Sequence, residues 1–157
     1  MTDLVEIYST SEDSFAVGYI IYQNKDRLFT HLVDDQGKLD GYLLFDSKMI
    51  DGIETKTDYL KKIEKYMDFW GNISIGDSDN EIYKSKPDFI DLIKYAKDNH
   101  KIITLSTSFD YFDSITGFVK SYDKEKVLVD ALNQTNAKIF DQFKVNLNEG
   151  SSVGHVI

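Results

Sequence analysis

The sequence contains no cysteine, one proline and one arginine among its 157 residues. Without cysteine, the chain has no disulfide, no thiolate nucleophile and no zinc–thiolate site. The single arginine, Arg27, disfavours nucleic-acid recognition, because bidentate contacts to phosphates and base edges rely on arginine. The sequence also lacks a long apolar run and a basic, apolar leader, so we expect a cytoplasmic protein with no membrane span.

Basic residues are outnumbered by acidic ones. Asp and Glu number 27 against 18 Lys and Arg, which gives a formal net charge of −9. Residues 1–70 hold fourteen acidic and eight basic side chains, a net charge of −6. The proportions of hydrophobic residues (41%) and charged residues (29%) are those of a folded globular protein. An acidic fold of this kind either stays soluble or meets a basic partner.

One segment of the chain recurs. Residues 18–34 begin with Gly18 and contain an apolar run, a polar turn and a second apolar run, and residues 117–133 repeat this plan from Gly117 onward. A Ser-Thr-Ser tripeptide precedes both copies. Self-similarity of this kind predicts two related modules within the chain.

Short strands joined by tight turns are predicted in both modules. The glycines at the start of the two copies predict either a bulge or bend, or room for a neighbouring aromatic side chain. In the first module we expect strands over residues 4–8, 15–22, 27–33, 38–46 and 49–54, with Gly37 in a turn. In the second module we expect residues 101–107, 115–122, 126–132, 137–147 and 153–157.

Two helices are predicted between the modules, over about residues 57–70 and 86–98. Thr57 is a suitable N-cap for the first helix, and Gly71 stands where a helix-ending glycine belongs. The second helix begins near Ser85 and Pro87, in a sequence that resembles a capping box. The apolar stripes that we expect to face the core are Leu60, Ile63, Met67 and Trp70 in the first helix, and Phe89, Ile90, Ile93 and Ala96 in the second.

The predicted fold class is mainly β with helices (α+β). Five short strands per module match the strand count of SH3-like and Sm-like barrels, so we expect one barrel in residues 1–56 and a related one in residues 101–157. A helical linker over residues 57–100 joins them. In strand count and turn spacing the repeat resembles the tandem small-barrel proteins of low-GC Gram-positive bacteria. No diagnostic family motif is present, and therefore no family's functional residues are carried over.

Two motifs resemble functional sites but lack necessary parts. Residues 150–154 fit G-x-S-x-G and precede His155, but a nucleophile elbow needs a following helix and only three residues remain. We expect a turn into the last strand there. In residues 77–81 acidic side chains occur at every second position, as in a calcium-binding loop. The glycine and glutamate that complete such a loop are missing, so we expect a solvated acidic loop.

His31 with Asp34 and Asp35 could form a metal or acid–base cluster. The equivalent positions of His31 and Asp34 in the second copy are Asp130 and Asn133, so the cluster is not repeated. The three histidines of the chain are scattered along it. We therefore expect no catalytic residue, metal site or cofactor.

Aromatic residues are numerous, with ten Tyr, ten Phe and one Trp. Tyrosines near strand ends and turns could form a peptide-binding groove of the kind that SH3-like barrels use, or they could fill the barrel cores. The candidate partner-binding residues are Tyr19, Tyr22, Asp34, Asp35, Tyr42 and Tyr122.

These observations predict a non-catalytic protein-interaction module that binds another protein, with a basic partner favoured by the charge. One specific form is an antitoxin or immunity protein that binds a basic toxin. The alternatives are an Sm-like nucleic-acid binder and a hydrolase or metal enzyme that uses an acidic cluster. The duplication is compatible with a monomer or a homodimer.

Overall fold

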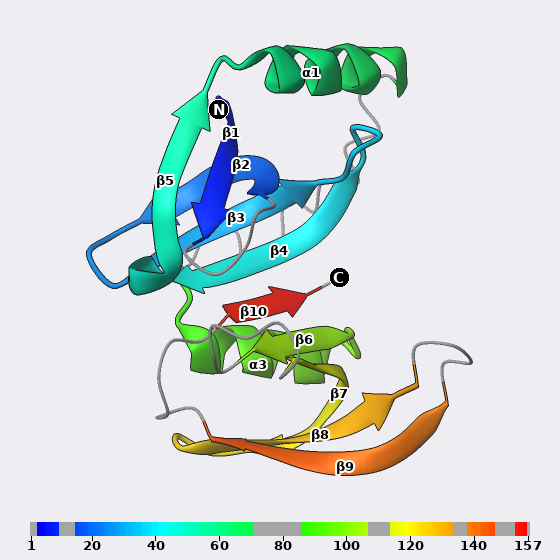
Figure 1. Cartoon of the computed structure of the whole chain (residues 1–157). Coiled ribbons are helices and arrows are strands. Elements are labelled where there is room, and N and C mark those ends of the chain that lie inside the picture. The colour runs from blue at the N-terminus through cyan, green and yellow to red at the C-terminus, as the bar shows by residue number, and fades with distance from the viewer. Residues whose placement is uncertain are drawn as a thin grey trace. The chain divides into compact units, whose positions relative to one another are not determined.

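The structure is a computed structural model that describes residues 3–9, 15–70, 86–106, 114–133, 138–146 and 153–156. The chain divides into two compact units, residues 1–86 and 87–157. The described part of the chain is mostly β, with antiparallel strands in each unit and two α-helices (Figure 1). The α+β fold class predicted from the sequence is therefore confirmed.

The first unit is a meander of four strands whose first strand also pairs with a fifth. The strand order is β5-β1-β2-β3-β4, and every described pairing in this unit is antiparallel. Its elements are β1 (Leu4–Ser9), β2 (Phe15–Gln23), β3 (Arg27–Val33), β4 (Leu39–Asp46), the 3-10 turn η1 (Ser47–Met49), β5 (Ile50–Thr55) and α1 (Asp58–Trp70).

The second unit has the strand order β10-β6-β7-β8-β9, again a meander whose first strand pairs with the last strand of the chain. Its elements are α3 (Phe89–Asp98), β6 (Ile103–Ser106), β7 (Ser114–Tyr122), β8 (Lys126–Leu132), β9 (Ile139–Asn146) and β10 (Val153–Val156). Helix α3 packs against β7 and β10. The two helices, which we placed together in a linker, thus fall in different units.

Helix α3 begins later than the sequence predicted. Its N-cap is Asp88, whose carboxylate accepts a hydrogen bond from the backbone N–H of Asp91 at 2.8 Å. The carboxylate of Asp91 accepts in return from the N–H of Asp88, which completes a capping box. The first helical residue is therefore Phe89, and Pro87 lies before the N-cap.

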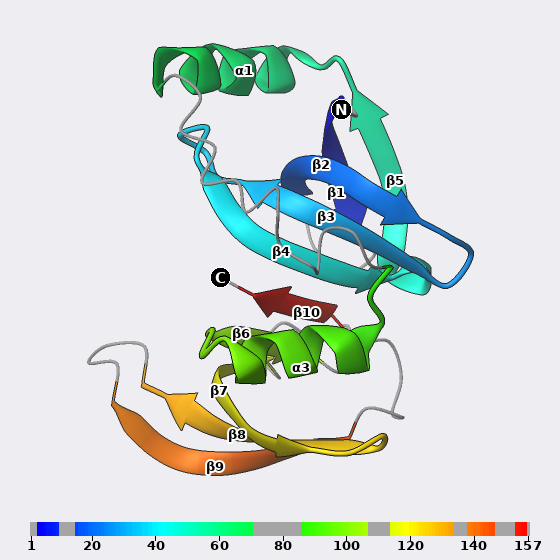
Figure 2. The same cartoon turned by 180° about the vertical axis from the view of Figure 1, so that it is seen from behind.

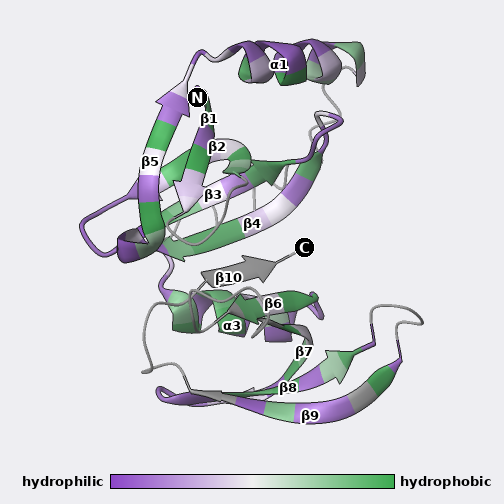
Figure 3. Cartoon of the chain, in the orientation of Figure 1, coloured by the Kyte–Doolittle hydropathy of each residue, from purple (hydrophilic) through white to green (hydrophobic). Residues whose placement is uncertain are grey.

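The core of the first unit lies between its sheet and α1. Leu4, Val17 and Val33 of the sheet cluster with Leu60 and Ile63 of the helix, and all five side chains are buried. Both faces of β3 and β4 are also buried, because consecutive residues along the middle of each strand are excluded from solvent. Figure 3 shows stretches of hydrophobic colour on these strands, interrupted by hydrophilic bands, and an alternation of hydrophobic and hydrophilic residues along α1.

Gly18 and Gly117 are required by close approach of the neighbouring strand. A Cβ atom at Gly18 would lie 2.5 Å from the carbonyl oxygen of His31, and one at Gly117 would lie 2.1 Å from that of Asp130. The register of each hairpin shifts shortly after the glycine, as the sequence predicted for a bulge. The glycines thus make room for backbone atoms of the adjacent strand, and not for an aromatic ring.

Some sequence predictions lie outside the described residues. They are the helix-ending glycine at position 71, the acidic loop at 77–81 and the glycine and serines at 150–152.

We predict that Gly18→Ala lowers the free energy of unfolding by about 1–3 kcal/mol, because the new methyl group forces apart two paired backbones. Urea unfolding followed by circular dichroism measures this change. Gly52→Ala is the matched control in the same unit, because a Cβ atom there meets nothing within 4 Å. Equal losses of stability in the two variants would contradict the prediction.

Candidate functional site

A surface groove of about 780 Å³ lies along one side of α1. Helix α1 supplies most of the lining, and the turn between β3 and β4 supplies the rest. The lining residues are Asp35, Gln36, Tyr59, Lys62, Lys65, Tyr66, Phe69 and Trp70. Figure 2 shows α1 running from the end of β5 to this turn.

The helical period explains why aromatic rings line the groove. Leu60 and Ile63 face the sheet and are buried, whereas Tyr66, Phe69 and Trp70 are 41%, 81% and 41% exposed. Residues three and four apart share a helix face, so Tyr66 and Phe69 lie on a flank next to the buried stripe. The C-terminal half of α1 thus presents three large aromatic side chains to solvent.

The aromatic rings contact one another and nearby lysines. The rings of Phe69 and Trp70 are 5.5 Å apart and nearly perpendicular. Lys62 Nζ lies 5.7 Å from the ring centre of Tyr59 and 5.6 Å from that of Tyr66. Each such contact at an exposed site stabilises by roughly 0.5–1 kcal/mol, so these contacts restrain the groove side chains only weakly.

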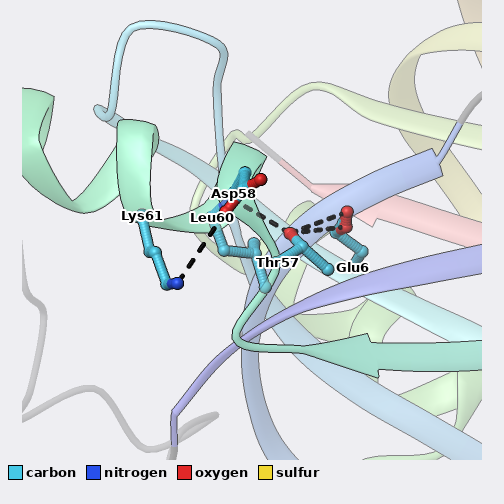
Figure 4. Close-up of polar contacts among 5 residues, drawn as sticks. All are labelled: Glu6, Thr57, Asp58, Leu60 and Lys61. Atoms are coloured by element: carbon cyan, nitrogen blue, oxygen red, sulfur yellow. Dashed lines mark hydrogen bonds and ion pairs between the residues drawn. The ribbon is translucent and has the colours of Figure 1, made fainter.

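A buried carboxylate holds the N-terminal end of α1. Glu6 of β1 is 3% exposed, and Thr57 Oγ1 lies 3.0 Å from each of its carboxylate oxygens (Figure 4). The same hydroxyl oxygen accepts a hydrogen bond from the backbone N–H of Leu60 at 3.1 Å. Thr57 is therefore the N-cap that the sequence predicted, and its hydroxyl links the sheet to the first turn of the helix.

Further acidic and phenolic groups lie next to Glu6. Glu54 of β5 is its partner across the strand pair, and the hydroxyl of Tyr8 donates to Glu6 Oε1 at 3.5 Å. Burial, followed by the charges of Glu6 and Glu54, raises the pKa of Tyr8 above its ordinary value of 10.0. Tyr8 is therefore protonated at neutral pH and available as a donor to the buried carboxylate.

The C-terminal end of α1 is held by the turn between β3 and β4. Trp70 Nε1 donates a hydrogen bond to the carbonyl oxygen of Gln36 at 3.0 Å. Gly37 has a φ of +81°, and a Cβ atom there would lie 2.9 Å from the backbone nitrogen of Met67. Lys38 Nζ lies 4.5 Å from the ring centre of Trp70. The groove is thus built on a helix that is fixed at both ends.

Of the sequence-predicted site residues, Asp35 lines the groove. Its neighbour Asp34 instead shapes the turn, because its Oδ1 atom accepts from the backbone N–H groups of Gln36 at 2.9 Å and Lys38 at 2.8 Å. Asp34 therefore sets the position of the groove wall without lining the groove itself.

The predicted tyrosines do not lie along this groove. Tyr42 is 6% exposed and its ring stacks on His31 at 4.6 Å between ring centres. Tyr22 is partly buried, with its ring 5.9 Å from that of Phe29. Tyr19 packs against the core and donates its hydroxyl to Met67 Sδ at 3.5 Å. These three rings serve packing in the first unit.

Tyr122 belongs to the other unit, where it pairs with Val127 across β7 and β8. His31 is buried, and its cross-strand neighbours are Tyr19 and Tyr42. Within the described ranges, no group of three or more His, Asp or Glu side chains is arranged to hold a metal ion.

Sequence reasoning missed the groove because it assigned Trp70 to the core stripe of α1. The signal was present in a second stripe, in which Tyr59, Lys62, Tyr66 and Phe69 follow one another at spacings of three and four. A helix that buries one stripe and carries aromatic residues on the adjacent stripe has more apolar surface than it buries against the sheet.

A comparison of the chain with protein-family models, curated proteins and solved structures finds no match. Neither helix of the described residues has the length and apolar character needed to cross a bilayer.

We predict that Thr57→Ala lowers the free energy of unfolding by about 2–4 kcal/mol, because it removes an N-cap and leaves the carboxylate of Glu6 without its closest donor. Urea unfolding measures the loss. Thr57→Ser keeps the hydroxyl and is expected to retain most of the stability. The prediction fails if the serine variant is as unstable as the alanine variant.

Proposed function

We propose that the protein is a non-catalytic protein-interaction module and that the groove on α1 is its contact surface. The observation that carries the proposal is the exposure of Tyr66, Phe69 and Trp70 together on one side of a helix that is fixed at both ends. Tryptophan and tyrosine are the residue types that most often dominate binding energy in protein interfaces.

The grouping of these exposed aromatic side chains is better explained by a binding surface than by chance exposure of single residues. Single exposed apolar residues are common on protein surfaces, but adjacent aromatic rings beside a concave surface are typical of interaction sites. Phe69 is 81% exposed, so it adds little to the core, and its ring is free to bury apolar area against a partner. A preformed helix lowers the entropic cost of such binding.

We further propose that the two units are related small barrels of the SH3-like or Sm-like kind that arose by duplication. Equivalent turns support this: the N–H of Asn24 bonds to the carbonyl of Arg27, and ninety-nine positions later the N–H of Asp123 bonds to that of Lys126. The side-chain oxygens of Asn24 and Asp123 also cap their turns in the same way. The common strand order and the return of the fifth strand to the first support barrels.

A second candidate function is an antitoxin or immunity role toward a basic protein. The observation that favours it is the net charge of −9, most of which belongs to residues 1–70. A strongly acidic surface speeds association with a basic partner through long-range attraction.

The proposal is tested by affinity capture from the source cell with the full chain as bait, followed by mass spectrometry. We expect Phe69→Ser to reduce recovery of a specific partner about tenfold or more, because aromatic contact residues at interfaces commonly contribute about 2 kcal/mol.

Ile139→Ser is the matched control for this capture, because Ile139 is a 58% exposed apolar residue in the other unit. Recovery should be unchanged with this variant. If the Phe69 variant captures the same proteins in the same amounts as the unsubstituted chain, the groove is not the contact surface.

A further inference from the structure

The net charge of the side chains that line the groove is opposite in sign to the net charge of the whole chain. Lys62 and Lys65 line it, and Asp35 is the only acidic residue among the lining residues. The chain as a whole carries a net charge of −9. The groove is therefore a local basic and aromatic surface on an acidic protein.

The helical period places Glu64 and Asp68, two of the three acidic residues of α1, away from Lys62. Glu64 and Asp68 lie four residues apart on one flank, whereas Lys62, Tyr66 and Phe69 share another. At 100° per residue the two flanks are about 150° apart around the helix axis. Glu64 thus lies on the side away from Lys62. Asp58 stands four residues before Lys62 and Asp68 three residues after Lys65, so carboxylates lie near both lysines, while the lining itself holds two lysines and one aspartate.

We propose that the groove binds an acidic segment of a partner protein that carries an aromatic or long aliphatic side chain among its carboxylates. This inference rests on the proposed interaction function and names its partner class. The apolar side chain would pack on Phe69 and Trp70, whose rings already meet edge to face at 5.5 Å. The flanking carboxylates would pair with Lys62 and Lys65.

The surroundings of Lys62 are consistent with an acidic, partly apolar peptide as the ligand of the groove. The Nζ atom of Lys62 lies within 6 Å of two ring centres, at 5.7 Å from Tyr59 and 5.6 Å from Tyr66. Lys62 is exposed, so its ammonium group is accessible to an incoming carboxylate while it lies beside the two rings. A ligand that combines a carboxylate with an apolar group satisfies both features of the groove at once.

Single-stranded nucleic acid is the competing ligand, because lysines beside stacking aromatics also bind unpaired bases. Two observations favour the acidic peptide. The lining contains no arginine, and the acidic surface of the chain repels a long polyanion more than a short segment with a few carboxylates.

The test titrates the full-length protein with short synthetic peptides and follows the fluorescence of Trp70, the one tryptophan of the chain. The probe peptide has a central phenylalanine flanked by glutamates. Three further probes are the same peptide with lysines for the glutamates, the same peptide with alanine for the phenylalanine, and an oligothymidylate. We expect the first peptide to bind about tenfold or more tightly than each of the other three.

Charge variants of α1 connect that preference to the groove. Lys62→Glu combined with Lys65→Glu should weaken binding of the acidic peptide about tenfold, and added salt should reduce the difference. Lys61→Glu is the control for charge reversal outside the lining, and it is compared with the single variant Lys62→Glu, which reverses the same number of charges. The control makes its charge reversal on the same helix, at a residue that is outside the groove lining and lies 3.8 Å from Asp58 Oδ1. Binding by this control should stay within about twofold.

The proposal is overturned if the lysine peptide or the oligothymidylate binds more tightly than the acidic peptide, or if Lys61→Glu weakens binding as much as Lys62→Glu. It is also overturned if no peptide binds while Phe69→Ser still abolishes partner capture. In that last case the interaction function stands and only the partner class is wrong, so the two proposals fail separately.

Discussion

A buried carboxylate on the first strand governs the arrangement of the first unit. Glu6 is 3% exposed, and removing a charged group from water is costly unless donors replace the lost hydration. The closest donor is the hydroxyl of Thr57, at 3.0 Å, which also caps α1. Because one hydroxyl serves both groups, the helix cannot leave the sheet without uncapping its first turn and leaving Glu6 with only the longer hydrogen bond from Tyr8. No buried side-chain nitrogen or oxygen in the described part of the chain lacks a partner.

The position of the groove follows from that anchor and from one glycine. With Thr57 fixed, the helical period directs Leu60 and Ile63 into the core. The far end of the helix then reaches the turn at Gly37, where only a residue without a Cβ atom allows the turn to approach the backbone of Met67 at this distance. The rotation of α1 about its axis is thereby set at both ends, and so is the direction of Tyr66 and Phe69. A surface of aromatic rings fixed in this way needs no ordering of the helix when a partner binds.

Much of the fold was predictable because it depends on local signals. The ten strands of the described residues follow from alternating or apolar runs between turn residues, and Thr57 is a standard N-cap residue. The anchor was not predictable, because Glu6 and Thr57 are 51 positions apart and nothing local to β1 indicates a buried acid. Trp70 was misassigned for a related reason. Helical spacing identifies a stripe, but it does not show where the sheet beneath the stripe ends.

The charge of the whole chain was a poor guide to the charge of this surface. Net charge describes long-range attraction and solubility, whereas a groove of about 780 Å³ experiences mainly the groups that line it. At physiological ionic strength the screening length is about 8 Å, so carboxylates farther away than this act only weakly on a ligand beside Lys62 and Lys65. The same helix therefore contributes acidity to the exterior on one side and a cationic, aromatic surface on the other. Composition could not distinguish these two sides, because that distinction depends on the rotation that Thr57 and Gly37 impose.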